Sequence, residues 1–173
     1  MLAYVFSHRA GPGADVAAYE EGLRAFHESL AVARPRGFVR SLTYRMAGGY
    51  SDWYLLEDSA ALDALNAAAV SGGRAGPHDA VARVAADGVG KLLSLAAGEV
   101  ELDAMVETRF SKPPGVGYAD LYAALGRLTA EPGAALWRRM MVLGPPPEFT
   151  LVTRSAVELP SEMRPEAVSR TQL

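Results

Sequence analysis

The stretch YRMAGGYSDWYLLEDSA, residues 44–60, decides the fold because the chain carries a second version of it. Residues 140–156, MMVLGPPPEFTLVTRSA, align with the first version without a gap. In each, two runs of β-forming residues flank a turn rich in glycine or proline, which predicts a β-hairpin. The matched pairs include Gly48 with Gly144, Asp52 with Glu148, and Trp53 with Phe149.

The segments upstream of the two hairpins also correspond. Residues 2–9 and residues 104–110 are rich in β-formers and end at Gly/Pro turns, so each predicts a strand. Residues 15–33 and residues 118–129 carry apolar side chains at helical spacing, which predicts two amphipathic helices. Few of the matched residues are identical, so a chance likeness between two hairpins is the alternative to a repeat of strand–helix–strand–strand.

Between the two copies, the pattern predicts two further helices, at residues 60–69 and 78–88. Residues 92–102 fit either an interrupted strand or a helix end followed by a short strand. We therefore expect a first repeat over residues 1–101 and a shorter second repeat over residues 102–160. Residues 161–173 are polar and are expected to form a loose tail.

A β-α-β-β-α-β unit is the ferredoxin-like plan, an α+β fold with an antiparallel sheet and helices on one face. Its other face must be covered, and two such sheets facing each other can do this. Over most of residues 2–157 the order of elements resembles the dimeric α+β barrel superfamily, with its NIPSNAP-like, EthD-like and antibiotic-biosynthesis-monooxygenase-like members. The resemblance implies a barrel with a ligand-sized interior, closed within the chain or across a homodimer. The sequence departs from this plan after Arg154, where no second helix or fourth strand is evident.

Composition narrows the classes of function. The 173 residues include no cysteine, which excludes disulfides, thiolate catalysis and cysteine-ligated metal sites. A net charge of −3 argues against a nucleic-acid partner. No apolar run approaches a membrane span, and the N-terminal segment predicts a first strand rather than a signal peptide. We expect a cytoplasmic protein, without a membrane partner, that forms a homodimer.

Three residues are candidates for catalysis: His8, Arg45 and Arg139. His8 ends the first predicted strand and could act as a general base, or could simply lie at the surface beside Arg9. Arg138 and Arg139 point to opposite faces of one strand, so one of them could enter a cavity and hold a carboxylate, enolate or phosphate. Alternatively, one arginine pairs with a nearby acid such as Glu148, and the other is solvated.

The remaining candidates would line a ligand site. Tyr44, Trp53, Tyr54, Trp137 and Arg138 could form the wall of a pocket, and for the aromatic residues a place in the core is the alternative. His27 lies near the apolar stripe of its helix, where it could ligate a haem or bond to a neighbour within the core. The histidines show no metal-ligand spacing, so neither a metal nor another cofactor is predicted.

The sequence leads to three functional hypotheses and leaves open whether the protein is an enzyme. The first is a cofactor-independent small-molecule enzyme, of the oxygenase, cyclase or isomerase type, with a pocket in the barrel interior. The second is a non-catalytic protein that binds a small molecule or haem. The third is a structural or assembly module with a filled barrel.

Overall fold

The computed structural model describes residues 1–100 and 102–173, which form two compact units. Unit 1 comprises Met1–Lys91 together with Gln172–Leu173, and unit 2 comprises Leu92–Thr171. Residue 101, where the sequence suggested the end of the first repeat, lies outside the described residues.

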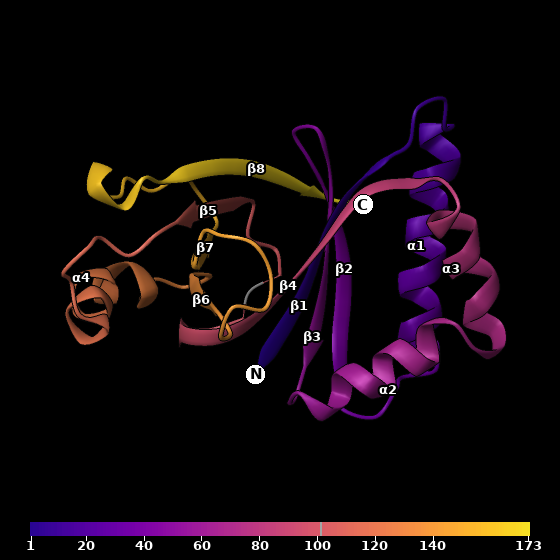
Figure 1. Cartoon of the computed structure of the whole chain (residues 1–173), viewed down its shortest axis with the longest axis horizontal. Helices are drawn as coiled ribbons and strands as arrows, with labels where there is room; N and C mark the ends of the chain where they lie inside the picture. Colours follow the sequence, from indigo (N-terminus) through magenta and orange to yellow (C-terminus); the bar gives the residue numbers. More distant parts are fainter. Residues whose placement is uncertain (101) are drawn as a thin grey trace. The chain divides into compact units, whose positions relative to one another are not determined.

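Unit 1 is a β-α-β-β sheet with helices packed on one of its faces (Figure 1). β3 is the central strand and pairs with β1 and β2 in antiparallel fashion. Its elements are β1 (Leu2–Ala10), α1 (Val16–Val32), β2 (Phe38–Met46), β3 (Gly49–Leu56), α2 (Ala60–Ala69), η1 (Gly72–Arg74), α3 (Ala75–Ala82) and the first part of β4 (Ala85–Gly98).

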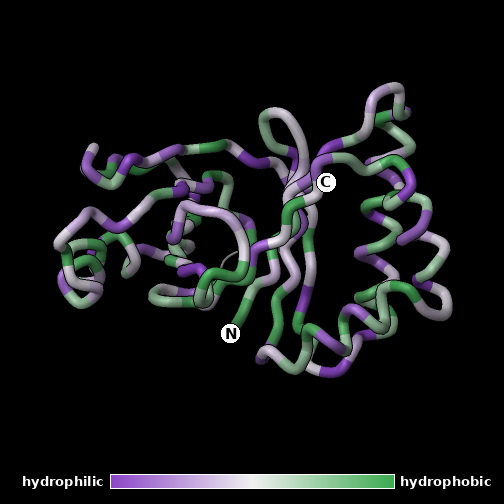
Figure 2. Tube along the Cα trace, in the orientation of Figure 1, coloured by the Kyte–Doolittle hydropathy of each residue, from purple (hydrophilic) through white to green (hydrophobic). Residues whose placement is uncertain are grey.

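Helix α1 begins after its N-cap residue, Asp15. The Asp15 carboxylate accepts hydrogen bonds from the backbone N–H groups of Ala17 and Ala18. The apolar stripe of α1 then packs on the sheet, and Figure 2 shows the alternation of apolar and polar residues along this helix. Phe26 and Leu30 meet Tyr54 and Leu56 of β3 in one buried cluster. Tyr54 therefore lies on the face of the sheet that the helices cover.

Unit 2 repeats the plan with one long helix. Leu121 and Leu125 of α4 pack against Phe110, Leu136 and Phe149 of its sheet. Its elements are the second part of β4, β5 (Val106–Phe110), α4 (Tyr118–Thr129), β6 (Ala135–Arg139), β7 (Phe149–Thr153), η2 (Ser161–Met163) and β8 (Glu166–Gln172).

The strands follow the order β1-β3-β2-β8-β5-β7-β6-β4, which is a closed barrel. The predicted α+β class with two ferredoxin-like repeats is thus confirmed, and closure occurs within one chain. β4 and β8 each contribute residues to both units. A homodimer is not needed to close the barrel and stays a prediction.

The loose tail predicted for residues 161–173 is wrong, because these residues form η2 and β8. β8 pairs with β5 and supplies the strand that the sequence seemed to lack. Arg170 is its one buried residue among mostly exposed neighbours, and its Nε donates to the Ala104 carbonyl at 2.7 Å. Backbone pairing and the Nε bond of Arg170 hold this strand, so it carries no apolar alternation that a pattern could detect.

The helix predicted for residues 78–88 is also wrong in its second half. α3 ends at Ala82, and β4 already begins at Ala85 and continues through Gly98. The sequence pattern did not predict this strand because Gly88 and Gly90 lie within it, and glycine is a poor strand former. A Cβ on Gly88 would lie 2.6 Å from Cζ of Phe6, so close packing of β4 on β1 explains the glycine.

Residues that the gapless alignment of the two hairpins matches do not lie on equivalent faces of their sheets. Phe149 packs against α4, whereas Trp53 is the neighbour of Tyr54 and therefore faces away from the helices of unit 1. Because side chains alternate along a strand, a slip of one residue exchanges the two faces. The order of elements repeats, but the residue register of the aligned hairpins does not.

Candidate functional site

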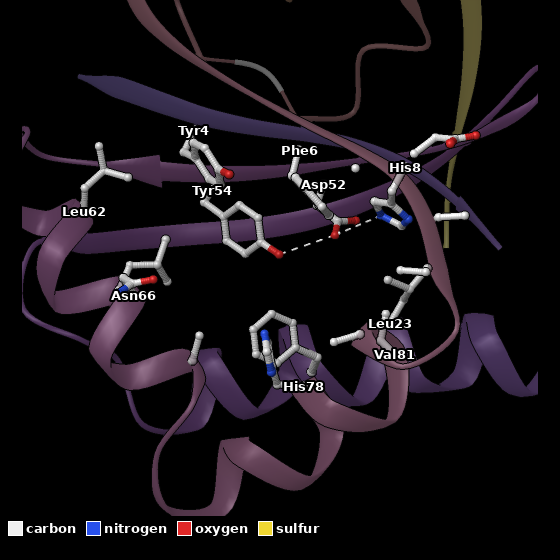
Figure 3. Close-up of a pocket in the computed structure, with 18 of the residues that line it drawn as sticks. Tyr4, Phe6, His8, Leu23, Asp52, Tyr54, Leu62, Asn66, His78 and Val81 are labelled. Atoms are coloured by element: carbon white, nitrogen blue, oxygen red, sulfur yellow. Dashed lines mark hydrogen bonds and ion pairs between the residues drawn. The ribbon is translucent and has the colours of Figure 1, made fainter. Parts of the chain in front are cut away.

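A pocket of about 660 Å³ lies within unit 1, between one face of the sheet and the three helices (Figure 3). We call it the aromatic pocket. Its sheet wall is formed by residues of β1 and β3, and its helix wall by residues of α1, α2 and α3, with the start of β4 beside them. The residues central to its chemistry are Tyr4, Phe6, His8, Asp52, Tyr54 and His78.

Strand alternation brings these side chains together. Tyr4, Phe6 and His8 are alternate residues of β1, and all three line the pocket. Phe6 pairs with Asp52 across the β1–β3 ladder, and Tyr4 pairs with Tyr54. Directly paired residues of antiparallel strands share a face, so Asp52 and Tyr54 enter the same wall.

Asp52 is the centre of the polar cluster. It is only 3 % exposed, and its Oδ2 lies 3.1 Å from Nε2 of His8. The Tyr54 hydroxyl donates to the same oxygen at 3.3 Å, as Figure 3 shows. An ionised carboxylate only accepts hydrogen bonds, so Nε2 of His8 carries the proton of this bond.

The imidazole of His8 contacts polar groups through both nitrogens and stacks on two aromatic rings. In its neutral form, Nδ1 accepts a hydrogen bond of 2.7 Å from the hydroxyl of Tyr19 on α1. Its ring stacks between Phe6 and Tyr50, with ring centroids 5.2 and 5.6 Å away. The result is a buried chain of groups that runs from Tyr19 through His8 to Asp52.

His27 approaches Asp52 from the other side. Its Nε2 lies 3.5 Å from Oδ1 of Asp52, longer than a good hydrogen bond, and its Nδ1 lies 2.7 Å from Oγ of Ser41. The ring stacks on Tyr54 at 5.2 Å. Nδ1 of His27 is thus held by Ser41, whereas Nε2 has no hydrogen-bond partner among the described residues, and haem ligation by His27 stays a prediction.

The cluster favours an ionised Asp52. Burial alone would raise the pKa of this carboxyl, but its interactions with His27 and His8 outweigh burial and hold the pKa well below its usual range. Burial, followed by the nearby charge of Asp52, raises the pKa of Tyr19 and of Tyr54. Both tyrosines therefore remain neutral donors at physiological pH.

Arg45, a predicted catalytic residue, lies next to this cluster but holds another group. Its guanidinium binds the carboxylate of Glu20 through two hydrogen bonds of 2.8 and 2.6 Å. The Tyr50 hydroxyl donates to Glu20 at 3.0 Å. The hydrogen bond from Arg45 lowers the pKa of Glu20 despite its burial. Arg45 thus neutralises a carboxylate of α1 and does not line the aromatic pocket.

The other sequence-based candidates lie elsewhere. Trp53 and Tyr44 are buried on the face of the sheet opposite Tyr54. Trp137 is buried in unit 2, where Arg138 donates to Glu148 at 2.8 Å and lies 3.7 Å above the Tyr118 ring. Arg139 donates to the Gly144 carbonyl at 2.8 Å. Of the predicted site residues, the structure brings together His8, His27 and Tyr54.

Sequence reasoning did not select Tyr4, Phe6, Asp52 and His78, which line the aromatic pocket, or Tyr19 and Ser41, which lie at hydrogen-bond distance from His8 and His27. Asp52 offered a signal, because it is a single carboxylate within the strand GYSDWYLL. Such a charge needs partners when the strand is buried. Its partners His8, Tyr54 and His27 come from β1, β3 and α1, and only the tertiary structure shows that they meet.

Among residues 1–100 and 102–173, no group of three or more histidine, aspartate or glutamate side chains could hold a metal ion. No helix in this part of the chain is long and apolar enough to cross a membrane.

No family model matches the sequence, and no curated protein sequence matches it. Three solved structures are similar in fold. An anthrone oxidase-like protein has a TM-score of 0.64 at 12 % identity, over 99 % of this chain and 91 % of its own. A candidate monooxygenase from Lactobacillus acidophilus NCFM has a TM-score of 0.61 at 12 % identity, over 99 % and 93 %. A candidate chlorite dismutase has a TM-score of 0.58 at 11 % identity, over 90 % and 80 %. These likenesses confirm the predicted α+β barrel fold.

Proposed function

We propose that the protein is a cofactor-independent enzyme that takes a proton from a flat, largely apolar ketone or phenol bound in the aromatic pocket. One observation carries this proposal. The buried carboxylate of Asp52 lies 3.1 Å from Nε2 of His8 on one wall of that pocket. This pocket lies on the helix side of the sheet, whereas the sequence had suggested the barrel interior.

The size and lining of the pocket indicate the class of ligand. About 660 Å³ is within the range of sites that enclose a small organic molecule. Phe6, Phe26, Tyr4 and Tyr54 contribute aromatic surface to its walls. Such rings favour flat ring systems by stacking and apolar burial. Polar side chains line both the sheet wall, with His8 and Asp52, and the helix wall, with Asp63, Asn66 and His78. A ligand with oxygen at its edges would match this lining.

His8 is the group suited to hold the proton. The pKa of Asp52 is lowered, so its carboxylate stays ionised, whereas an imidazole nitrogen can accept a proton. A proton that enters the pair therefore resides on His8, and Asp52 stays ionised as its counter-ion. Upon protonation, Nδ1 of His8 becomes a donor and the Tyr19 hydroxyl becomes its acceptor. An aspartate that orients and stabilises a histidine acts in this way in hydrolytic triads.

His78 on α3 lies across the pocket from Asp52 and Tyr54 (Figure 3). Its Nδ1 lies 3.2 Å from the Asp79 carboxylate, and the edge of its ring meets Phe26. Nε2 has no protein partner among the described residues. We assign His78 a positioning role, in which Nε2 of the neutral ring accepts a hydrogen bond from a hydroxyl of the ligand, because Nδ1–H is directed at the Asp79 carboxylate.

The fate of the resulting anion defines the type of enzyme. The names of two proteins of similar fold, an anthrone oxidase-like protein and a candidate monooxygenase, support an oxidation by O₂. An isomerase would instead return the proton to another carbon, and a cyclase would form a bond within the ligand. All three share the first step, the removal of a proton, so this step is the one to test.

A second candidate function is ligand binding without turnover. Both ring nitrogens of His8 already have protein partners, Asp52 and Tyr19. If these bonds persist when a ligand is bound, the polar wall would orient the molecule without reacting. The structural-module hypothesis has less support, because a filled protein would not need a pocket of this size in unit 1.

The test uses anthrone, the ring ketone in the name of the similar protein, as the probe. The full chain is incubated with anthrone in D₂O under nitrogen, and mass spectrometry follows deuterium uptake at the methylene carbon. We expect the wild type to accelerate exchange, and His8→Gln and Asp52→Asn to reduce this acceleration by roughly 10²-fold or more. Asp120→Asn changes the same charge on the exposed first turn of α4 and should leave exchange unchanged.

Two outcomes would count against the proposal. If Asp52→Asn exchanges deuterium as fast as the wild type, the Asp52–His8 pair is not the proton acceptor. If a fluorescence titration shows that anthrone binds while exchange stays at the background rate, the binding function replaces the catalytic one.

A further inference from the structure

The loop between β6 and β7 in unit 2, residues 140–147 (MMVLGPPP), exposes a run of large apolar side chains (Figure 1). Met141 is 78 % exposed, Val142 79 % and Leu143 48 %. We call residues 140–147 the apolar loop. We propose that the apolar loop inserts into the surface of a phospholipid bilayer, so that the protein binds membranes peripherally. This proposal does not depend on the function of the aromatic pocket.

The backbone of the apolar loop is suited to an environment with little water. Residues 145–147 are prolines and have no N–H group. The N–H of Met140 donates to the Leu92 carbonyl at 2.8 Å, that of Leu143 to the Met140 carbonyl at 3.1 Å, and that of Gly144 to the Val142 carbonyl at 3.0 Å. An N–H group without a partner is costly in the apolar part of a bilayer. Because these three donors are already bonded, the loop can leave water at a low cost.

The tip of the apolar loop is held in a fixed but unfavourable conformation. Met141 has a φ of 53°, in the left-handed region that residues other than glycine rarely adopt. Hydrogen bonds to Leu92 on β4 hold both ends of the tip, from the Met140 N–H and to the Leu143 carbonyl, the latter at 3.0 Å. An exposed apolar tip on a strained backbone contributes little to folding, and such features occur where a surface binds something.

Basic and aromatic side chains surround the base of the apolar loop. Two arginines, residues 138–139, immediately precede it. The centroid of the Tyr118 ring lies 3.7 Å from Cζ of Arg138 and 5.4 Å from Nζ of Lys112. Tyrosine and basic side chains suit the layer of lipid headgroups. Glu148 at the base and Asp120 on α4 are acidic, so we expect the apolar tip to supply the main attraction and the cations a smaller one.

The small size of the apolar tip favours a bilayer over a protein partner. A stable protein interface buries about 800 Å² on each partner, and three side chains of one turn are too few to supply this area. A bilayer needs no complementary surface, and it takes up any exposed apolar side chain. Peripheral binding requires no membrane-spanning helix, and none was found among residues 1–100 and 102–173. The proposal departs from our expectation of a protein without a membrane partner.

The absence of cysteine from the chain allows a single fluorescent label to be placed on the loop. Val142→Cys in the full chain is labelled with a fluorophore that responds to polarity. The labelled protein is then titrated with vesicles of phosphatidylcholine and phosphatidylserine in equal amounts. We expect its emission to shift to shorter wavelength as the tip enters the bilayer. Val32→Cys is the matched control, because Val32 is 88 % exposed in unit 1, and its label should show no shift.

Co-sedimentation of the unlabelled protein with the same vesicles measures affinity. The double variant Met141→Ser/Val142→Ser should weaken binding tenfold or more, because two apolar side chains no longer leave water. Val70→Ser, at a position 57 % exposed in unit 1, should bind as the wild type does. Vesicles of phosphatidylcholine alone should still bind the wild type, more weakly, because apolar insertion does not need anionic lipid. Circular dichroism verifies that each variant is folded.

Four outcomes would overturn the proposal. The first is a wild type that does not sediment with the mixed vesicles, and the second is an equal emission shift from the labels at Val142 and Val32. The third is a complete loss of binding on phosphatidylcholine alone, which would leave only electrostatic attraction. The fourth is a dimer in sedimentation velocity that the double variant abolishes, which would make a second copy of the chain the partner of the loop.

Discussion

Oδ2 of Asp52 lies 3.1 Å from Nε2 of His8, although 44 positions separate the two residues in the sequence. Asp52 is on the central strand β3, and His8 is near the end of β1. The contact depends on the register of these strands, in which Asp52 is paired with Phe6 and His8 with Tyr50. The pair is buried and lines a pocket, so it bears on both stability and chemistry.

Removal of the Asp52 side chain should destabilise the protein. Asp52→Ala leaves Nε2–H of His8 and the Tyr54 hydroxyl without their acceptor, which should lower the free energy of unfolding by about 3–5 kcal/mol. Urea denaturation followed by circular dichroism measures the difference. Asp120→Ala on the exposed surface should stay within about 0.5 kcal/mol of the wild type. Equal stability of Asp52→Ala and the wild type would contradict the hydrogen bonds from His8 and Tyr54 to Asp52.

Asp52 should also make the free energy of unfolding depend on pH in the acidic range. The pKa of Asp52 is lower in the folded protein than in the unfolded chain, where the pKa of an aspartate is about 3.9. Its contribution is therefore fully present above about pH 4 and is lost as the pH falls through the lower folded value. Urea denaturation at pH 7 and pH 3 should show a smaller acid-induced loss in Asp52→Asn than in the wild type. A parallel loss in the two proteins would show that Asp52 is not ionised preferentially in the folded state.

Arg45 should matter for stability and not for proton exchange. Arg45→Met removes both hydrogen bonds to Glu20, so the free energy of unfolding should fall, by less than in Asp52→Ala. The exchange of anthrone protons should be unchanged, because Arg45 does not line the aromatic pocket. A double-mutant cycle with Glu20→Gln isolates the energy of the pair. A loss of exchange without a loss of stability would restore Arg45 as a catalytic candidate.

Gly88 should control the shape of the aromatic pocket. A Cβ at this position would lie 2.6 Å from Cζ of Phe6, so Gly88→Ala forces the ring of Phe6, a wall of the pocket, to move. We expect anthrone to bind several-fold more weakly, as measured by fluorescence titration. Gly76→Ala is the control, because a Cβ there meets no atom within 4 Å. It lies within α3 and should stabilise the protein by about 0.5–1 kcal/mol without weaker binding.

The candidate site could be predicted from the sequence only in part. His8 was identified because a histidine at a strand end is a general-base candidate, and Tyr54 because an aromatic strand residue can line a pocket. Arg138 shows the limit of such reasoning. Its residue type suits a ligand as well as it suits Glu148, and only the 2.8 Å contact with Glu148 shows where its Nε is directed. Asp52 was overlooked because its partners lie on other elements.

The sequence by itself determined the order of elements, the α+β class and the hairpin pair. These follow from local features, namely the alternation of strands, the apolar stripe of α1, the Asp15 cap and the turn glycines. The tertiary structure decided the strand β8, the face on which each side chain lies and the meeting of His8, His27 and Asp52. Those depend on register and on pairing between distant segments, where a shift of one residue exchanges the two faces of a sheet, and no local pattern encodes that choice.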